Sequence, residues 1–406
     1  MRILFVHNRY KQSTGGEDSA VEAEIKLLES NGHQVSLLLF DNATIGNGVI
    51  NQVKAGITAI YNVNSKKKLQ EVIQLFSPDI IHIHNLFFEA SPSVLYAAKE
   101  SGIPVILTVH NYRLLCVNAL LLRNGKVCED CVQSVFPWKG IIRKCYHNSI
   151  ADSALVGLIT TTHKLRSTWS TKIDRFVTPS SFIRSKLLNS SLSITDPDKI
   201  VVKGNFIDDP EDAPPSERKD FFLFVGRLSA EKGIHFLLSS FAKWPHLKIL
   251  IVGDGPDKDE LLKQYSQYPN ISFEGKKGKN EVLALMKQAK ALIFPSIWYE
   301  GLPLTIVEAF ASGLPVIATR LGAMQEMISH KINGFLFEKE DPDSLKSAIQ
   351  EINSMVQQGN YALYNGARNI FMEHYHADVC YKKIMDIYTA AIQERRIKQV
   401  SKTNSF

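Results

Sequence analysis

Glu300 and Glu308 are the residues of this 406-residue sequence whose type and spacing point most directly to chemistry. The apolar run Ala291–Phe294 before them predicts a buried strand that ends in a loop. Pro303 suits the first turn of a helix, where its missing N–H costs nothing. We therefore expect Glu300 just before a helix N-terminus and Glu308 about two turns inside that helix.

The start of such a helix attracts anions, because its first N–H groups are free and its dipole is positive there. A carboxylate at this place would repel a ligand that carried phosphate alone. It suits a ligand that carries both phosphate and hydroxyl groups, such as a sugar nucleotide. The pair of glutamates therefore indicates a site for a sugar nucleotide.

A second string of residues, Phe224–Ile234, brings two cations to another helix start. An apolar run ends in Gly226-Arg227, and Lys232 follows five residues after Arg227. Two cations at a helix N-terminus are repelled by its dipole, so this arrangement favours an anion between them.

Together the two strings resemble the signature of the retaining glycosyltransferases of family 4, the glycosyl transferases group 1, which have the two-domain GT-B fold. The resemblance implies that Glu300 reaches the hydroxyl groups of the donor sugar and that Glu308 holds the ribose of the nucleotide. It implies that Arg227 and Lys232 clamp the donor diphosphate. It also implies donor contacts from the backbone of Gly226, Gly301, Leu302, Pro303 and Leu304.

Two further elements of the first half match the family. Gly15 and Gly16 lie between the first expected strand and the first helix, where N–H groups can approach a ligand closely; the resemblance sets this loop against the donor. His110 ends another expected strand. The resemblance implies that His110 contacts the sugar or the acceptor and is not a simple general base. The expected catalytic set is thus Glu300, His110, Arg227 and Lys232.

Apolar runs alternate with helical patterns along the whole chain, which predicts doubly wound α/β domains with parallel sheets. The expected strands include Ile3–Val6, which His7 and Asn8 follow, and Ile80–Ile83. The resemblance implies GT-B architecture, with two Rossmann-like domains facing across a cleft. We expect an acceptor-side domain at 1–207 and a nucleotide-sugar domain at 208–384, joined by a linker at Asp208–Asp220. A C-terminal helix at about 385–400 should cross back to the first domain, as GT-B chains commonly do.

Four cysteines within a short span depart from the generic family pattern. Cys116, Cys128, Cys131 and Cys145 could hold a structural zinc, with His147 as a substitute for one thiolate. The alternative is four reduced, partly buried thiols. Disulfides are not expected in a cytoplasmic protein.

The net charge of +6 lies in the first half of the sequence. Residues 1–207 contain 23 Lys and Arg against 16 Asp and Glu, whereas residues 208–406 contain 24 against 25. The alternatives are a solvated face or peripheral contact with an anionic membrane. No basic motif with stacking aromatics indicates nucleic acid. We expect a cytoplasmic protein, without a signal peptide or a transmembrane helix, and possible peripheral attachment to the cytoplasmic face of the membrane.

The sequence therefore predicts a retaining glycosyltransferase that moves a hexose-type sugar from a nucleoside-diphosphate sugar to a glycan or lipid-linked acceptor. Synthesis of a surface polysaccharide or glycoconjugate fits that activity. No cofactor is expected for catalysis, since the Asp-x-Asp pairs are scattered and GT-B enzymes generally need no metal. The alternatives are a GT-B sugar-nucleotide epimerase and a non-catalytic protein that binds nucleotide sugars.

Overall fold

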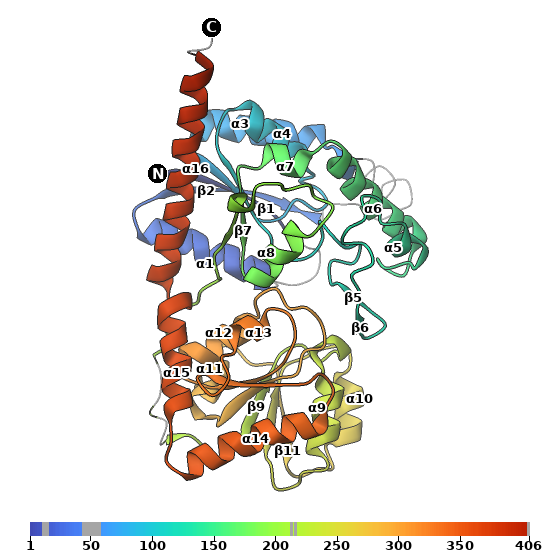
Figure 1. Ribbon diagram of the computed structural model, residues 1–406, viewed down its shortest axis with the longest axis vertical. Coiled ribbons are helices and arrows are strands. Elements are labelled where there is room, and N and C mark those ends of the chain that lie inside the picture. Colours follow the sequence, from blue (N-terminus) through green and yellow to red (C-terminus); the bar gives the residue numbers. More distant parts are fainter. Residues whose placement is uncertain (10–15, 43–57, 212–213, 215–216, 404–406) are drawn as a thin grey trace. The chain divides into compact units, whose positions relative to one another are not determined.

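The computed structural model describes residues 1–9, 16–42, 58–211, 214 and 217–403, and it divides into two units (Figure 1). The first unit comprises Met1–Leu121, Glu129–Gly204 and the chain from Cys380 onward. The second comprises Leu122–Cys128 and Asn205–Val379. Each unit is built on its own six-stranded sheet.

The sheet of the first unit is parallel throughout, in the order β2-β1-β3-β4-β7-β8. Such a sheet needs helices on both faces, and the sequence supplies a helix after nearly every strand. The strands are β1 (Arg2–Arg9), β2 (Gln34–Asp41), β3 (Ile80–Ile83), β4 (Val105–Thr108), β7 (Arg175–Thr178) and β8 (Ile200–Val202).

The described helices of the first unit include one that comes from the end of the chain. They are α1 (Gly16–Ser30), α3 (Val63–Phe76), α4 (Ser93–Glu100), α5 (Trp138–Ile142), α6 (Ile150–Leu165), α7 (Thr168–Lys172), α8 (Ser181–Leu188) and α16 (Ala377–Thr403). From Cys380 onward α16 groups with this unit, and its Ile384 and Tyr388 pack in one cluster with Ile3 and Phe5 of β1.

The sheet of the second unit has the order β11-β10-β9-β12-β13-β14 and is also parallel. Along β9, Phe222 and Phe224 enter one apolar cluster and Leu223 enters another, so the sheet is covered on both faces. The strands are β9 (Phe222–Val225), β10 (Ile249–Val252), β11 (Ile271–Gly275), β12 (Ala291–Phe294), β13 (Val316–Thr319) and β14 (Gly334–Phe337).

Helices and short turns of helix connect these strands. They are η4 (Ala230–Lys232), α9 (Ile234–Phe241), α10 (Lys258–Tyr265), α11 (Lys279–Gln288), α12 (Leu304–Ala311), α13 (Met324–Met327), α14 (Pro342–Gln357), α15 (Ala362–Ile370) and η5 (Phe371–Tyr375). A small antiparallel hairpin, β5 (Leu122–Arg123) and β6 (Lys126–Val127), groups with this unit although it interrupts the first in sequence.

The doubly wound α/β prediction is confirmed, with some corrections. β3 and β12 have the predicted bounds. β1 is longer than predicted: His7 and Asn8 do not follow the strand but pair with Leu39 and Phe40 of β2. Glu308 lies about one turn inside its helix rather than two, because α12 begins at Leu304. Among the described residues, no helix is both long and apolar enough to span a membrane.

Candidate active site

The carboxylate of Glu300 is held by three donors in the second unit, where the chain leaves β12. Its Oε1 atom accepts from Lys232 Nζ at 2.7 Å, from Ser296 Oγ at 2.8 Å and from Trp298 Nε1 at 2.9 Å. The residue is 6% exposed. A buried carboxylate needs such compensation, since removing its charge from water is costly. Glu300 is therefore fixed in position, and Lys232 offsets its charge.

A glycine makes this ion pair possible. Gly233 has φ +71° and lies so close to the loop after β12 that a Cβ there would be 1.9 Å from the carbonyl oxygen of Pro295. No larger residue can take this backbone conformation at this distance. The close approach lets η4 carry Lys232 to Glu300.

The two predicted clamp cations differ in their surroundings. Lys232 is paired with Glu300, and its Nζ lies 5.7 Å from the ring centre of Phe294 and 5.5 Å from that of Trp298. Arg227 is exposed, and its guanidinium makes no hydrogen bond or ion pair with any residue that the structure describes. The structure thus brings Lys232 to Glu300 and leaves Arg227 with its charge in solvent.

The start of α12 offers free backbone donors. Pro303 caps the helix with φ −70° and ψ 110° and without a side-chain hydrogen bond. The backbone N–H groups of Leu304 and Thr305 donate to no acceptor in the described part of the chain. Free N–H groups and a helix dipole are the features that the predicted anion site requires.

Glu308 lies about one turn further along α12, on the same face as Leu304. Its side chain is half-buried, and its carboxylate has no hydrogen-bond or ion-pair partner among the described residues. Burial raises the pKa of Glu308 to about 6, against a small opposing effect of the Lys279 charge. A half-buried acceptor without a partner is costly in the free protein, which is typical of a ligand contact.

Close packing of two loops explains two more glycines beside this site. A Cβ on Gly253, which follows β10, would lie 1.8 Å from the carbonyl oxygen of Gly226, which follows β9. A Cβ on Gly255 would lie 2.3 Å from that of Leu228. Gly226 therefore borders the loop after β10, and the Gly-x-Gly pattern there serves backbone packing.

In the first unit, His110 is paired with a second histidine. His110 Nε2 lies 2.9 Å from His84 Nδ1, and the two rings are stacked at 5.2 Å. Both line a small cavity of about 30 Å³ together with Asn111 and Arg113. Burial lowers the pKa of His110 to about 3 and holds the pKa of His84 well below its usual value. Both rings are therefore neutral at physiological pH.

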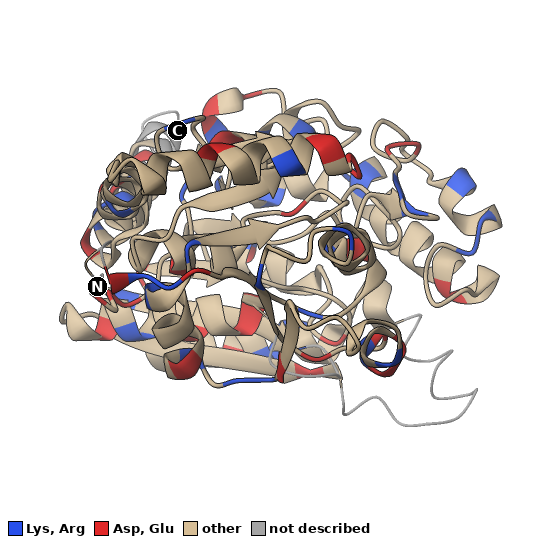
Figure 2. Ribbon diagram, turned by 90° about the horizontal axis from the view of Figure 1, so that it is seen from below, with Lys and Arg blue, Asp and Glu red and all other residues tan. Residues whose placement is uncertain are grey.

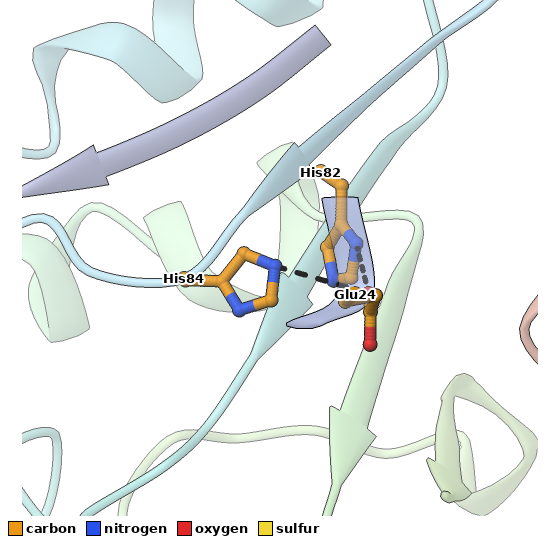
Figure 3. A group of neighbouring side chains, drawn as sticks. All are labelled: Glu24, His82 and His84. Atoms are coloured by element: carbon orange, nitrogen blue, oxygen red, sulfur yellow. Dashed lines mark ion pairs between the residues drawn. The ribbon is translucent and has the colours of Figure 1, made fainter. Parts of the chain in front are cut away.

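Behind His84 lies a buried carboxylate (Figure 3). Glu24 Oε1 is 4.0 Å from His84 Nε2 and 3.1 Å from His82 Nδ1. Lys203 Nζ forms an ion pair with the other oxygen. Burial alone would raise the pKa of Glu24, but Lys203 and the hydrogen bond to His82 outweigh it and keep the carboxylate ionised.

The charge of Glu24 decides which nitrogens carry hydrogen. A carboxylate repels a lone pair, so we assign the hydrogen of His84 to Nε2, which faces Glu24. His84 Nδ1 must then accept, and His110 Nε2–H donates to it. His110 is left with an unprotonated Nδ1, which can accept a hydrogen bond from a hydroxyl group.

Glu24, His82 and His84 are also the one group of three metal-ligand side chains that the described residues bring within 4.8 Å. Lys203 already neutralises the carboxylate. Both nitrogens of His82 are engaged, Nδ1 with Tyr388 and Nε2 with Thr108, each at 2.7 Å. These contacts favour a hydrogen-bond network over a metal ion.

Of the two glycines in the predicted donor loop, only Gly16 lies within the described residues. Gly15 lies outside the described residues, and Gly16 is the first residue of α1. Just beyond it, Asp18 accepts a hydrogen bond from buried His7 over 2.7 Å, and Glu17 accepts one from Asn111 over 3.3 Å. Burial raises the pKa of Glu17 to about 8. The start of α1 thus lies beside the strand that leads to His110.

Comparisons with known proteins agree with the two units. Residues 14–210 match the family described as "Glycosyltransferase Family 4", and residues 205–366 match "Glycosyl transferases group 1". Between them the two matches span most of the chain. This chain is a family 4 glycosyltransferase.

Curated relatives of this family 4 glycosyltransferase match it over different lengths. An uncharacterized glycosyltransferase of Methanocaldococcus jannaschii, MJ1607, is 29% identical over 42% of this chain and 45% of that protein, so the chain spans less than half of that relative. The UDP-Gal:alpha-D-GlcNAc-diphosphoundecaprenol alpha-1,3-galactosyltransferase of Escherichia coli is 23% identical over 86% of this chain and 88% of that protein.

The fold of the family 4 glycosyltransferase is that of solved GT-B structures. Anabaena Alr3699/HepE in complex with UDP matches with a TM-score of 0.65 over 96% of this chain and all of that chain, at 15% identity. At this identity the match shows the fold alone.

The cysteines of this family 4 glycosyltransferase are all free thiols. A tetrahedral zinc site would bring Cys116, Cys128, Cys131 and Cys145 to within about 4 Å of one another. The structure describes all four, but Cys128 groups with the second unit and the other three with the first. The zinc site therefore stays a hypothesis. Elemental analysis decides it: about one zinc per purified chain would establish the site, and none would remove it.

Proposed function

We propose that this chain is a retaining glycosyltransferase that moves a hexose-type sugar from a nucleoside-diphosphate sugar to a glycan or lipid-linked acceptor. The second unit binds the donor, and the first contributes His110 and the acceptor contacts. None of the five cysteines, all of which the structure describes, forms a disulfide, which supports a cytoplasmic site of action because disulfides are rare there.

Glu308 carries this proposal. It is half-buried and lacks a partner among the described residues, and it lies about one turn from the free N–H groups of Leu304 and Thr305. One face of α12 thus offers donors for phosphate and an acceptor for hydroxyl groups. A nucleoside diphosphate carries both, with the ribose hydroxyls on Glu308.

The chemistry breaks the bond between the anomeric carbon and the diphosphate and forms a bond from that carbon to the acceptor oxygen. Negative charge grows on the leaving diphosphate, and offsetting it is the main electrostatic task. Arg227, Lys232 and the N–H groups at the start of α12 supply the positive charge. The leaving phosphate takes the acceptor's proton, as is usually proposed for the family.

Glu300 contacts the donor sugar and does not act as a nucleophile. Its Oε1 already accepts three hydrogen bonds, one of them from a lysine, and such a carboxylate is a weak nucleophile. The absence of an evident nucleophile agrees with retention by departure and attack on the same face of the sugar. His110 accepts a hydrogen bond from a sugar or acceptor hydroxyl through Nδ1.

The relatives support the acceptor class. By its name, the Escherichia coli protein acts on a sugar linked to diphosphoundecaprenol, and its match extends over most of both chains. A lipid-linked acceptor would bring this chain to a membrane, so the proposal includes peripheral contact with an anionic membrane through the basic first half. Assembly of a surface polysaccharide or glycoconjugate is the matching role.

Isothermal titration with UDP and GDP tests the donor site. The wild-type chain should bind at least one of them. Glu308→Gln should weaken binding by about 1–3 kcal/mol, since the ribose hydrogen bonds are lost. Glu260→Gln, on the exposed face of α10, is the matched control and should bind as the wild type does.

The outcome separates the alternatives. Unchanged affinity for the nucleoside diphosphate in Glu308→Gln would contradict the proposed contact between Glu308 and the ribose. Binding without consumption of any donor sugar would favour a non-catalytic protein, and conversion of a donor to its epimer without an acceptor would favour an epimerase.

A further inference from the structure

One face of α6 is exposed and carries no charge. Ile150, Leu158 and Leu165 are 53%, 49% and 72% exposed. Five other residues on this side of the helix are not buried either, namely Ala151, Ala154, Leu155, Thr161 and Thr162. At 100° per residue, all eight side chains fall within a sector of about 140° around the helix axis. The opposite side holds Val156, Ile159 and His163, all buried. A helix that is apolar on both sides normally has both sides covered.

Helix α5 extends the same apolar surface. Pro137 and Ile141 pack against Gly157 of α6, as the neighbouring ribbons in Figure 1 also show. On its outer side, Phe136, Trp138 and Ile142 are 50%, 52% and 65% exposed. Seven of the sixteen large apolar residues that are exposed in the described part of the chain lie between Val135 and Leu165. Such a concentration marks a binding surface.

The surface is bordered by cations. Figure 2 shows both signs of charge over much of the chain, but residues 135–166 contain five Lys and Arg against one Asp. Lys144 and Arg166 are exposed and make no side-chain hydrogen bond or ion pair with a described residue. Lys139 and Arg143 pair with Asp130. The single acid, Asp152, lies on the side of α6 away from the exposed face.

We propose that Phe136, Trp138, Ile142, Ile150, Leu158 and Leu165 form a surface that inserts into the headgroup region of an anionic phospholipid bilayer. Exposed aromatic and aliphatic side chains with a cationic border are the chemistry that such a bilayer binds. A second copy of the chain fits less well, because a symmetric interface would bring the two cationic borders together. This deepens the proposed function, in which a lipid-linked acceptor brings the chain to a membrane.

Vesicle flotation with the purified chain tests the surface. The chain should float with vesicles of phosphatidylcholine and phosphatidylglycerol, and salt should weaken the association. Vesicles of phosphatidylcholine alone should bind it less. Leu158→Ser combined with Leu165→Ser should lower the affinity on the order of tenfold. Leu75→Ser, at an 85% exposed leucine of α3 in the same unit, is the matched control.

Two further variants separate the contributions. Lys144→Glu should weaken binding to the anionic vesicles, whereas Lys26→Glu on α1 should not. Tryptophan emission should shift to the blue with vesicles and lose that shift in Trp138→Phe. Trp169 and Trp244 are buried already, and Trp298 is held by Glu300 in the second unit. All variants should unfold at the wild-type temperature and release nucleoside diphosphate from a donor at the wild-type rate.

Three results would overturn the proposal. The first is a wild-type chain that does not bind anionic vesicles. The second is a Leu158→Ser/Leu165→Ser variant that binds as tightly as Leu75→Ser. The third is self-association of the wild type, lost in the same variant, because it would assign the surface to a second copy. None of these results depends on turnover, so failure here removes the membrane contact and leaves the proposed sugar transfer standing.

Discussion

Lys232 and Glu300 form an ion pair within the second unit, with Nζ 2.7 Å from Oε1. Neither residue is near the other in sequence, and the close approach at Gly233 brings them together. The pair holds a cation ready beside the free N–H groups of α12 while it keeps a buried carboxylate neutralised. In the proposed function, a donor diphosphate therefore meets one cation that is already positioned, Lys232, and one that is free, Arg227.

This difference predicts distinct effects of removing each cation. Lys232→Ala should lower turnover and also the free energy of unfolding, by about 1–3 kcal/mol, because it leaves the Glu300 carboxylate without its cation. Arg227→Ala should lower turnover by about a hundredfold and stability by less than about 0.5 kcal/mol, since its side chain is exposed. Steady-state rates and urea titrations measure both. Lys243→Ala, exposed in the same unit, is the control; wild-type turnover in Arg227→Ala would contradict the clamp.

The raised pKa of Glu308 predicts that this residue lowers the free energy of unfolding as the pH rises. Its pKa is about 6 in the folded chain against 4.5 for an unperturbed glutamate, so the folded state holds the proton more tightly. Its stabilising effect is complete below pH 4.5 and is lost as the pH rises through 6. Glu308→Gln should therefore match the wild type in stability at low pH and exceed it by up to about 2 kcal/mol at about pH 8. Urea unfolding at several pH values tests this. A difference that does not change with pH would refute it.

Gly233 and Gly359 form a matched pair for the close approach at the active site. Both have positive φ, +71° and +68°, but a Cβ on Gly359 meets no atom within 4 Å. Gly359→Ala should cost only backbone strain, about 1 kcal/mol. Gly233→Ala adds a clash with Pro295 and should cost at least about 2 kcal/mol more. It should also lower turnover, because Lys232 moves. Equal stability of the two variants would show that the approach is not tight.

His110 should remain neutral and keep Nδ1 unprotonated across the physiological range, because burial lowers its pKa to about 3. Nitrogen-15 spectra of histidine-labelled protein should show the Nε2–H form. His84→Ala should disturb that form and lower turnover, whereas His163→Ala, at a buried histidine with two hydrogen bonds elsewhere in the unit, should leave both unchanged. A protonated His110 at neutral pH would contradict the assignment.

Most strands that are buried on both faces could be predicted from the sequence, and β3 and β12 have the predicted bounds. Their apolar runs are short and end at polar residues. β14, which also packs on both faces, was not predicted. β7 and β8 were not predicted, because Arg175–Thr178 and Ile200–Val202 are brief and become strands only by pairing with β4 and with each other.

The proposed donor-side residues lie in two compact strings of sequence, so the sequence alone was enough to propose them. The network behind His110 could not be predicted in this way. Glu24 falls in the apolar stripe of α1 beside Val21 and Leu28, which was a signal, but its partner Lys203 is 179 residues away. The exposed apolar surface of α5 and α6 was also missed. When a helix has apolar residues on both sides, its sequence does not show which side packs against the rest of the fold.

Transfer of a sugar from a nucleoside-diphosphate donor can be measured in a mass-spectrometric screen of nucleotide sugars with the purified chain. We expect at least one donor to lose its sugar to water or to an acceptor and to release the nucleoside diphosphate. Glu300→Gln should abolish most of this release. A chain that binds nucleoside diphosphates but consumes no donor, with or without acceptors, would contradict the proposed transfer.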